Sequence, residues 1–484
     1  MADERDFFHL NRLKGFNDAV FPIVATILIL PIRKLEVDSD TSLEKLMEER
    51  WVKVAVYFVA FLVICSVWES HVNRFRILSH TDDILVWLNL TSLLFVCFLP
   101  FTCNLEATFY EKYTPTILIC VDLLILELLE VIIVLYSFSN DALLTNEILD
   151  LPFDQRREQR NYMLLKKVVK PCLYILAASL SMVNKDVAWV LLGLVIISPC
   201  LYRFLGFLFR SVMNIHMGRA DFDRMFGNLI DTERVECFSD GAFAIVATLL
   251  VLDLTAEDFP TKEDIIEKGI QKSLLNLWRE FITFVGTFFV VALLWFVHHS
   301  LFHCIKKMNQ VMLVCNNILL AFMGLSPLLS VVINKFGRNQ DQDEIRAVQF
   351  SSVVIFGASI AQFLVFVVAL LLGPSHLTSE ASPRMSPKSH SYLVAKLSVL
   401  PLVSLIVYWT SFSSPFITYV VYHSALLATP ILFIMLKVCF GRGSDGMTME
   451  IPVSSQSENI EQWMPRPVPA PRSRAPRARQ TVAM

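Results

Sequence analysis

Long apolar runs constrain this chain more than any other feature of its sequence. A helix that crosses a bilayer needs about 20 apolar residues, and twelve stretches meet this need. They are 15–32, 51–70, 84–103, 115–138, 168–184, 187–208, 238–254, 277–299, 311–334, 349–373, 392–410 and 415–440. Hydrophobic residues make up 55% of the 484 residues, which is more apolar surface than a water-soluble body of this length can bury. The sequence therefore predicts an all-α membrane protein with twelve transmembrane helices.

The distribution of basic residues predicts the orientation of these helices. An even number of spans places both termini on one side of the membrane. With the N-terminus in the cytosol, the basic run 156–170 and the basic tail both fall on the cytosolic side, and so do Arg203, Arg210, Arg219, Arg224 and Arg234. The loops of the other face are poorer in Lys and Arg. The positive-inside rule therefore predicts that both termini are cytosolic.

Polar segments flank and divide the apolar runs. We expect a cytosolic N-terminus at 1–14, a cytosolic linker at 211–233 and a flexible loop at 374–390. The tail at 441–484 is rich in Pro and Arg, cannot form a core and is expected to be disordered. The net charge of -3 is close to neutral, so nothing indicates nucleic-acid binding.

The chain contains an internal repeat. Arg12, Phe16 and Asp18 precede the run AVFPIVATILIL, and the same pattern recurs 222 residues later before GAFAIVATLLVL. Five further matches share an offset of 227, namely Trp68 with Trp295, His71 with His298, Phe75 with Phe302, Asn89 with Asn316 and Pro100 with Pro327. The chain therefore consists of two six-helix units, at 15–210 and 234–440. Since six is even, both units insert the same way up, related by an axis along the membrane normal.

The repeated polar residues fall at one depth near the cytosolic end of the first three helices of each unit. Buried polar groups need partners, and ionisable groups in a membrane are costly and usually functional. We therefore expect a cytosolic collar formed by Arg12, Phe16, Asn17, Asp18, His71 and Asn89 in the first unit, and by Arg234, Phe238, Ser239, Asp240, His298 and Asn316 in the second. Such a collar either fixes the helices by hydrogen bonds or attracts cations and senses protons.

The first helix of each unit continues beyond the collar with an apolar stripe. Helical spacing places Ile23, Thr26 and Leu30 on one face, and Ile245, Thr248 and Leu252 are their equivalents. A stripe of this kind is typical of helix packing. The repeat, however, places two such helices at equivalent sites around a common axis, which favours pore lining.

An Arg-x-x-x-Phe-Ser-Asp motif that opens an apolar helix, present at the head of both units, resembles the signature of the endolysosomal potassium channel family. The resemblance covers about residues 10–440 and includes the Trp and His pairs of the second helices. It implies a homodimer in which four first helices, two from each chain, line one central pore. It also implies a leak channel for potassium and protons in late endosomal and lysosomal membranes.

The motif match assigns roles to particular residues. Ile23 and Ile245 would form a hydrophobic constriction, and Thr26 and Thr248 would bias permeation towards potassium. Asp18 and Asp240 would belong to the collar that responds to protons. The first unit departs from the motif at Asn17, where the family has Ser. It also has Pro22 before the constriction, where the second unit has Ala244, and a proline can kink a helix.

The physics of permeation agrees with a hydrophobic constriction. No TVGYG-like segment that would provide a carbonyl filter is present, whereas an apolar ring can gate by dewetting. Potassium loses its water more readily than sodium does, so such a ring can favour potassium. The permeating ions, the lipid and a second copy of the chain are the expected partners.

Two other classes of protein were weighed. Parallel repeats also occur in secondary transporters, but these usually bind their substrates at the membrane midplane, whereas the polar residues here lie at one end. An enzyme is disfavoured because no HExxH, GxSxG or paired-Asp motif occurs. Asp122, Glu127 and Glu130 have no counterparts in the second unit and are predicted to pack against polar neighbours. We expect no cofactor and no metal.

Overall fold

The computed structural model describes residues 9–33, 42–198, 231–252, 254–255, 259–337 and 342–441. Residues 1–437 form one compact unit, and the remaining residues form a second one. Within the described residues the chain is helical, apart from two isolated β-bridges. Most of the predicted linker at 211–233, all but the first residue of the tail at 441–484, and the second half of the span at 187–208 lie outside the described residues.

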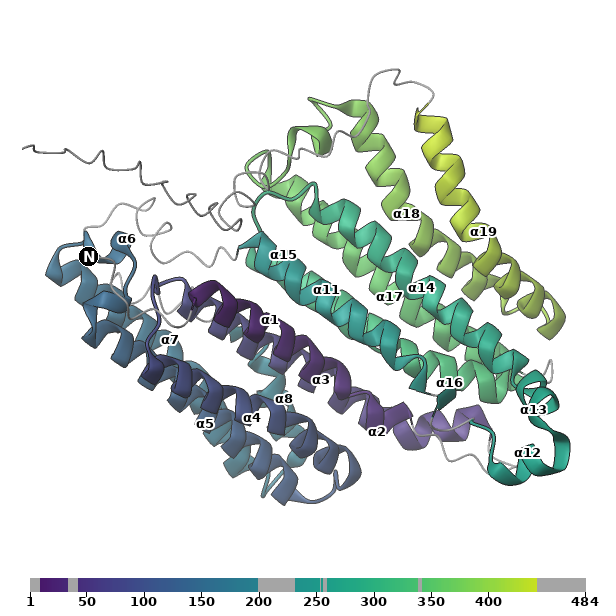
Figure 1. Cartoon of the computed structure of the whole chain (residues 1–484), viewed down its shortest axis with the longest axis horizontal. Coiled ribbons are helices and arrows are strands. Elements are labelled where there is room, and N and C mark those ends of the chain that lie inside the picture. The colour runs from purple at the N-terminus through teal and green to yellow at the C-terminus, as the bar shows by residue number, and fades with distance from the viewer. Residues whose placement is uncertain are drawn as a thin grey trace, which may run out of the picture. The chain divides into compact units, whose positions relative to one another are not determined.

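The first repeat is built from one helix for each predicted span, with short additions (Figure 1). Its elements are α1 (Leu10–Ile27), α2 (Leu30–Arg33), α3 (Leu43–Phe75), α4 (Asp83–Thr108), α5 (Tyr113–Ser139), η1 (Asp141–Leu143), α6 (Asn146–Leu149), α7 (Phe153–Leu180) and α8 (Lys185–Leu194). Helix α1 packs against α3 and α4, and α5 packs between α4 and α7. The helices follow one another in space largely as they do in sequence.

The second repeat has the same order of helices. Its elements are α11 (Thr232–Leu249), α12 (Lys262–Lys268), α13 (Ile270–Asn276), α14 (Trp278–Phe302), α15 (Gln310–Met323), α16 (Ser326–Phe336), α17 (Gln342–Leu372), η3 (Ser379–Ala381), α18 (Pro387–Thr410) and α19 (Pro415–Gly441). Helix α11 packs against α14 and α15, as α1 packs against α3 and α4. The two repeats meet where α1 lies beside α11 (Figure 1).

Eight helical segments in the described part of the chain are long and apolar enough to cross a membrane. Three other long helices occupy predicted spans but carry more charge. Helix α5 contains three acidic residues, α7 contains three lysines in its apolar half, and α11 begins with charged residues. The chain is therefore an all-helical membrane protein, and the total of twelve spans stays a prediction.

The first helix of each repeat ends five residues earlier than the sequence predicted. Helix α1 ends at Ile27 and α11 ends at the equivalent Leu249. The Thr26 hydroxyl donates to the Pro22 carbonyl at 2.7 Å, and such a side-chain bond to the preceding turn weakens the regular helical ladder. Pro31 then lacks the N–H that would continue the helix. Leu30 therefore starts α2 instead of continuing the stripe of α1.

The third helix of the second repeat is interrupted where that of the first is continuous. Helix α4 continues through Pro100, whereas α15 ends at Met323 and α16 begins at Ser326, just before Pro327. The interruption coincides with a close approach between repeats, because the Tyr57 hydroxyl of α3 donates to the Ala321 carbonyl at 3.0 Å. A Cβ atom on Gly324 would lie 2.2 Å from that hydroxyl oxygen. Glycine is therefore required at this point.

The segment predicted as a flexible loop is tied to the helix ends around it. Thr378 donates to the Cys304 carbonyl at 2.9 Å, and Lys306 donates to the His376 carbonyl at 2.8 Å. Leu377 between them is buried. Burial also raises the pKa of the Cys304 thiol to about 11. The first repeat closes in the same way, with an isolated bridge between Leu78 and Leu144.

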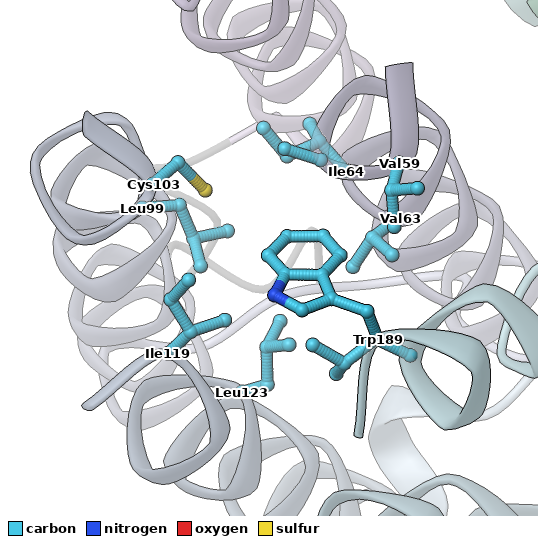
Figure 2. A pocket seen from close by; sticks show the side chains of 10 residues that line it. Val59, Val63, Ile64, Leu99, Cys103, Ile119, Leu123 and Trp189 are labelled. Atoms are coloured by element: carbon cyan, nitrogen blue, oxygen red, sulfur yellow. The ribbon is translucent and has the colours of Figure 1, made fainter. Parts of the chain in front are cut away.

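The core of the first repeat contains a small apolar cavity between α3, α4, α5 and α8. Its lining includes Val63, Leu99, Ile119 and Leu123, and the indole ring of Trp189 projects among them (Figure 2). The cavity lies away from α1 and α11, so it is not part of a pore along those helices.

Candidate functional site

Both repeats hold the motif aspartate with the tryptophan of the second helix. Trp68 Nε1 donates to Asp18 Oδ1 at 3.0 Å, and Trp295 Nε1 donates to Asp240 Oδ1 at 2.8 Å. Asp18 is buried, whereas Asp240 is exposed. The sequence matches Trp68/Trp295 and Asp18/Asp240 thus correspond to one contact that is made twice.

Both repeats also enclose the matched histidine between two phenylalanines. The His71 ring centroid lies 5.3 Å from that of Phe21 and 5.0 Å from that of Phe75. In the second repeat, His298 lies 5.3 Å from Phe243 and 4.2 Å from Phe302. Both histidines are 1% exposed. These stacks fix the second helix against the first at the level of the collar.

In the second repeat the histidine, the asparagine and the serine of the collar form a short chain of hydrogen bonds. His298 Nε2 lies 3.0 Å from Asn316 Oδ1, which accepts only, so this ring nitrogen donates. Asn316 Nδ2 then donates to Ser239 Oγ at 3.0 Å. The three side chains connect α14, α15 and α11.

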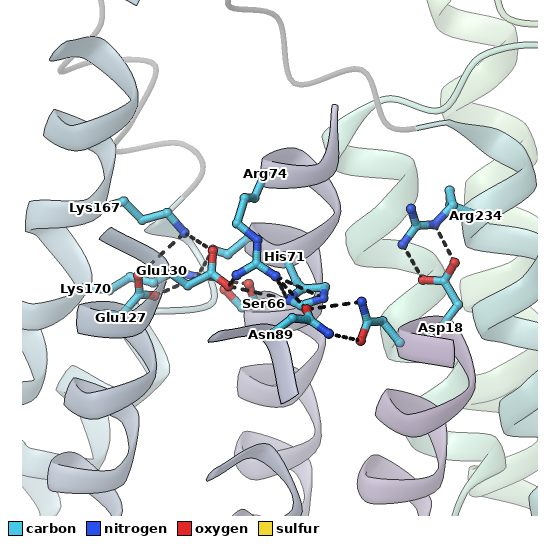
Figure 3. Close-up of polar contacts among 12 residues, drawn as sticks. Asp18, Ser66, His71, Arg74, Asn89, Glu127, Glu130, Lys167, Lys170 and Arg234 are labelled. Atoms are coloured by element: carbon cyan, nitrogen blue, oxygen red, sulfur yellow. Dashed lines mark hydrogen bonds and ion pairs between the residues drawn. The ribbon is translucent and has the colours of Figure 1, made fainter. Parts of the chain in front are cut away.

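In the first repeat an arginine, and not the matched histidine, donates to the asparagine. Arg74 Nη2 donates to Asn89 Oδ1 at 3.0 Å, and Asn89 Nδ2 donates to Asn17 Oδ1 at 3.0 Å (Figure 3). Arg74 Nη2 also lies 2.7 Å from His71 Nδ1. Because a guanidinium has donors only, that ring nitrogen must accept. Asn17, the departure from the family motif, has the length to pair with Asn89.

Arg74 in turn belongs to a buried charged cluster that links α3, α5 and α7 (Figure 3). Its Nη1 lies 2.5 Å from Glu130 Oε1, and Lys167 Nζ lies 3.2 Å from Glu130 Oε2. Lys170 Nζ lies 3.7 Å from Glu127 Oε1 and donates to the Ser66 carbonyl at 2.9 Å. We call Arg74, Glu127, Glu130, Lys167 and Lys170 the charged cluster.

The sequence did not predict the charged cluster. Glu127 and Glu130 were predicted to pack against polar neighbours, and the structure gives them ion pairs. Lys167 and Lys170 were counted as cytosolic loop charges, but they lie within α7 and face those carboxylates. Acidic and basic residues at i, i+3 spacing on two neighbouring apolar helices were the signal that would have revealed the pairs.

The motif arginine of the second repeat contacts the aspartate of the first, not its own. Arg234 Nη2 donates to Asp18 Oδ1 at 2.7 Å, and Nε approaches Oδ2 (Figure 3). The expectation that each motif arginine meets the aspartate of its own repeat is therefore wrong for Arg234. Arg234 and Asp240 are six residues apart, which turns them about 120° from each other on a helix, so Arg234 faces the neighbouring α1.

Arg12, the equivalent of Arg234, is exposed, and its side chain makes no hydrogen bond or ion pair with any described residue. It lies on an exposed face of α1 together with Phe16, which is 51% exposed, Ala19 and Ile23, which is 41% exposed. We call these four residues the open face of α1. Their equivalents on α11, such as Phe238 at 0% exposure, are largely covered by the first repeat.

Helix α11 has an open face of its own, formed by Cys237, Asp240, Ala244 and Thr248. The equivalents of three of these residues on α1 are covered, since Asp18, Pro22 and Thr26 are buried beside α11, whereas Gly15, the equivalent of Cys237, is exposed. A Cβ atom on Gly241 would lie 3.0 Å from Pro22 Cγ, so glycine there makes room for the proline. The departure at Pro22 is thus matched by a smaller residue on the helix that faces it.

The predicted pore residues lie in different environments. Ile23 and Ile245 both remain at least partly accessible, and so do Leu30 and Leu252. Thr248 is exposed and donates to the Ile245 carbonyl at 2.8 Å. Thr26 is fully buried and donates to carbonyls of its own helix. The roles of the two threonines in selectivity stay a prediction.

No group of three or more His, Cys, Asp or Glu side chains within the described residues is arranged to hold a metal ion. The charged cluster holds three cationic groups beside two carboxylates, so the cations already occupy the positions that a metal would take.

Comparison with known proteins identifies close relatives. The family described as "Endosomal/lysosomal potassium channel TMEM175" matches the chain twice, at residues 12–100 and 234–327. Both matches begin at the motif arginine and end at the matched proline. The "Endosomal/lysosomal proton channel TMEM175" of Gallus gallus is 33% identical over 444 residues, which cover 88% of this chain and 86% of that protein.

More distant relatives come from bacteria. A potassium channel of Chamaesiphon minutus is 30% identical over 106 residues, which cover 22% of this chain and 51% of that protein. A crystal structure titled as a lysosomal potassium-selective channel TMEM175 homolog from Chamaesiphon minutus matches 44% of this chain and 98% of that one. Its TM-score is 0.33, with 22% sequence identity.

Proposed function

Because this chain belongs to the endosomal/lysosomal potassium channel family, whose members are ion channels and not enzymes, we propose that it forms a potassium-selective, proton-permeable leak channel of endosomal and lysosomal membranes. In this proposal it sets the membrane potential and luminal pH of these organelles. The names of its relatives, potassium channel and proton channel, support both permeant ions. The basic residues of the sequence support cytosolic termini.

The observation that carries the proposal is the complementarity of the two open faces. Within one chain, the face of α1 that contains Asp18 and Pro22 covers the face of α11 that contains Arg234 and Phe238. The open face of α11 is the equivalent of the α1 face that contains Asp18 and Pro22. The open face of α1 is the equivalent of the α11 face that contains Arg234 and Phe238. A second copy of the chain can therefore repeat the same contact.

Two such contacts close a ring. Helix α11 of each copy would cover α1 of the other, so that four helices surround one axis in the order α1, α11, α1, α11. A two-fold dimer has this closed symmetry. The ring gives partners to groups that lack them in the single chain. By equivalence with the Arg234–Asp18 pair, Arg12 of each copy would reach Asp240 of the other.

The aromatic contacts support the same arrangement. The Phe238 ring lies 4.4 Å from that of Trp68 within one chain. By equivalence, Phe16 would lie against Trp295, which is 38% exposed in the single chain. Phe16 and Trp295 together would then leave water on dimer formation, as Phe238 and Trp68 already have.

The four-helix ring supports a hydrophobic constriction at Ile23 and Ile245. Both side chains remain accessible, next to the faces where α1 and α11 cover each other. A residue that points towards the ring axis has this position. No ionisable side chain occupies the next turn of either helix in the direction away from the collar. An apolar ring of this kind can block ions by dewetting and can favour the ion that loses water more easily.

Current recording from membranes that contain the full-length protein tests the proposal. We expect a potassium current that needs no substrate and exceeds the sodium current, together with a proton current under an acid gradient. Ile23→Asn and Ile245→Asn should each raise conductance and weaken the preference for potassium. Ile132→Asn, on the exposed side of α5, is the matched control and should change neither.

The outcomes separate the proposal from its rivals. If both variants conduct as the wild type does, the constriction lies elsewhere. If potassium current is absent at every voltage, the channel proposal fails. Flux that occurs only with a coupled second solute would instead favour the secondary transporter with parallel repeats.

A further inference from the structure

One acidic side chain of the membrane interior lies outside both the collar and the charged cluster. Asp122 lies in the middle of α5 and is 3% exposed. Neither of its carboxyl oxygens has a hydrogen-bond partner, and no other carboxyl group in the described residues is buried with both oxygens unpartnered. Nothing in the proposed pore explains a polar group at this position.

The helices around Asp122 provide no counter-charge for it. Helix α5 packs chiefly against α4 and α7, and also against α3. The buried charged side chains on these helices have partners of their own: Glu106 pairs with Lys185, Glu127 with Lys170, Glu130 with Arg74 and Lys167, and Glu69 accepts from Gln310. The thiol of Cys103 on α4 is a titratable group close to Asp122. Tyr174 lies one turn beyond Lys170 on α7, and therefore at a depth in the membrane similar to that of Asp122.

An ionised carboxylate is not stable in such surroundings. Moving a carboxylate out of water without a partner costs far more than moving the neutral acid, so an isolated group takes up a proton instead. We propose that Asp122 is a proton-binding site of the first repeat, separate from the pore, which holds one proton as a neutral carboxylic acid. The ligand of the site is therefore a proton and not a metal cation.

The cavity of Figure 2 lies beside the turn of α5 that carries Asp122, and we infer that protons reach the site from there. Ile119 and Leu123, which flank Asp122 on α5, line it together with Cys103 and Trp189. Its volume of about 20 Å³ is enough for about one water molecule. On its other side, Trp189 Nε1 donates to Glu106 Oε1 at 2.9 Å. The cavity lining therefore includes both the turn of α5 that carries Asp122 and Trp189, which is hydrogen-bonded to Glu106.

At this end Glu106 is hydrogen-bonded to the start of α5, and the turn between α4 and α5 is hydrogen-bonded to α8. The Thr116 hydroxyl donates to Glu106 Oε2 at 2.9 Å, and the Tyr110 hydroxyl donates to Asp186 Oδ1 at 2.9 Å. Burial, together with Asp186, raises the pKa of Tyr110 to about 12, so Tyr110 remains a donor. Because the cavity lining is apolar, water enters it rarely, and the proton on Asp122 exchanges slowly through this end.

Infrared difference spectroscopy of the full-length protein in lipid vesicles tests the protonation of the site. The wild type minus Asp122→Asn should give the carbonyl band of a protonated carboxylic acid at neutral pH, and this band should shift slowly in D₂O. Trp189→Phe, which opens the cavity slightly, should speed that shift several-fold. A difference spectrum with only carboxylate bands would overturn the proposal, and an unchanged rate in Trp189→Phe would overturn the route.

Chemical labelling of the wild type decides the matter if Asp122→Asn does not fold. Dicyclohexylcarbodiimide is hydrophobic and reacts with protonated acids. The acid proton moves to a carbodiimide nitrogen while the carboxyl oxygen adds to the central carbon, and the adduct rearranges to a stable N-acylurea with no group lost. Peptide mapping should find the label on Asp122 and not on Glu127 or Glu130, whose ionised forms are paired.

Labelling also has a defined pH dependence. Once most of the acid is ionised, labelling should fall about tenfold for each further pH unit. Asp122→Glu should retain the label and Glu127→Gln should leave it unchanged at Asp122. Labelling of Glu127 or Glu130 with none at Asp122 would overturn the proposal. Neither experiment measures ion current, so their failure is distinguishable from failure of the channel proposal.

Discussion

In the second repeat His298 donates directly to Asn316, whereas in the first repeat Arg74 donates to Asn89 and His71 lies beside Arg74 and Glu130. The position of Arg74 is occupied by Leu301 in the second repeat, and α17 contains no acidic residue after Glu344. In one repeat the hydrogen-bond chain of the collar has no Arg, Lys, Asp or Glu member, and in the other it is connected to buried charges. Since both repeats have the Trp–Asp contact and both enclose the histidine between two phenylalanines, the charges are an addition to a shared frame.

This comparison teaches that a duplicated unit can keep its geometry while its electrostatics diverge. A buried ion pair contributes little net stability, but breaking it is costly because one charge is left without a partner. The first repeat should therefore be the more sensitive to single substitutions, and the second the more tolerant. The following variants test that difference, beginning with the largest expected effect.

Glu130→Gln should be the most damaging substitution in the collar region. It leaves Arg74 and Lys167 buried without the carboxylate that both contact, which should cost about 3–5 kcal/mol of unfolding free energy. Denaturant unfolding of the purified protein in detergent measures the loss. The double variant Arg74→Leu/Glu130→Gln, which imitates Leu301 of the second repeat, should recover most of it. Equal losses in the single and double variants would contradict this account.

Asp18→Asn should destabilise the single subunit, whereas Asp240→Asn should weaken the dimer. Asp18 accepts from Arg234 and Trp68, and losing a hydrogen bond to a charged group costs about 1.5–3 kcal/mol. Asp240 contacts only Trp295 among the described residues, and an asparagine oxygen can still accept that bond. Asp18→Asn should therefore lower the free energy of unfolding, and Asp240→Asn should raise the dimer dissociation constant. Identical behaviour of the two variants would contradict the proposed ring.

Asn17→Ser restores the family motif and should nevertheless destabilise the first repeat. A serine side chain is too short to replace both hydrogen bonds between Asn17 and Asn89, at 3.0 and 3.3 Å. The expected loss is about 1–2 kcal/mol, from bonds lost and a buried amide left partly unpaired. Thermal unfolding measures it. Ser239→Asn, the reverse exchange in the second repeat, should also destabilise because it overpacks the contact with Asn316.

Gly241→Ala should have the smallest effect, at about 1 kcal/mol, because its Cβ atom would lie 3.0 Å from Pro22 Cγ and overpacking strains the helix contact. Pro22→Ala should relieve the strain, so that the double variant is more stable than the sum of the single effects predicts. A double-mutant cycle by thermal unfolding measures the coupling. Additive effects would show that Pro22 and Gly241 do not constrain each other.

The parts of the site that the sequence predicted are those that repeat. The Trp68/Trp295, His71/His298 and Asn89/Asn316 matches indicated which residues meet near one depth, because equal spacing on equal helices gives equal positions. The sequence could not predict the charged cluster in the same way. Its members lie on three helices of one repeat, and nothing in the other repeat marks them.

The amino-acid sequence by itself determined that this is a helical membrane protein with a repeated motif, and which family it belongs to. Apolar run length and repeated motifs are local properties, so they can be read along the chain. Only the tertiary structure decided that Arg234 reaches Asp18, that Lys167 and Lys170 are buried ion-pair partners, and that Thr26 is covered while Thr248 is open. These facts depend on how each helix is rotated against its neighbours, and that rotation is set by the packing of side chains from distant parts of the chain.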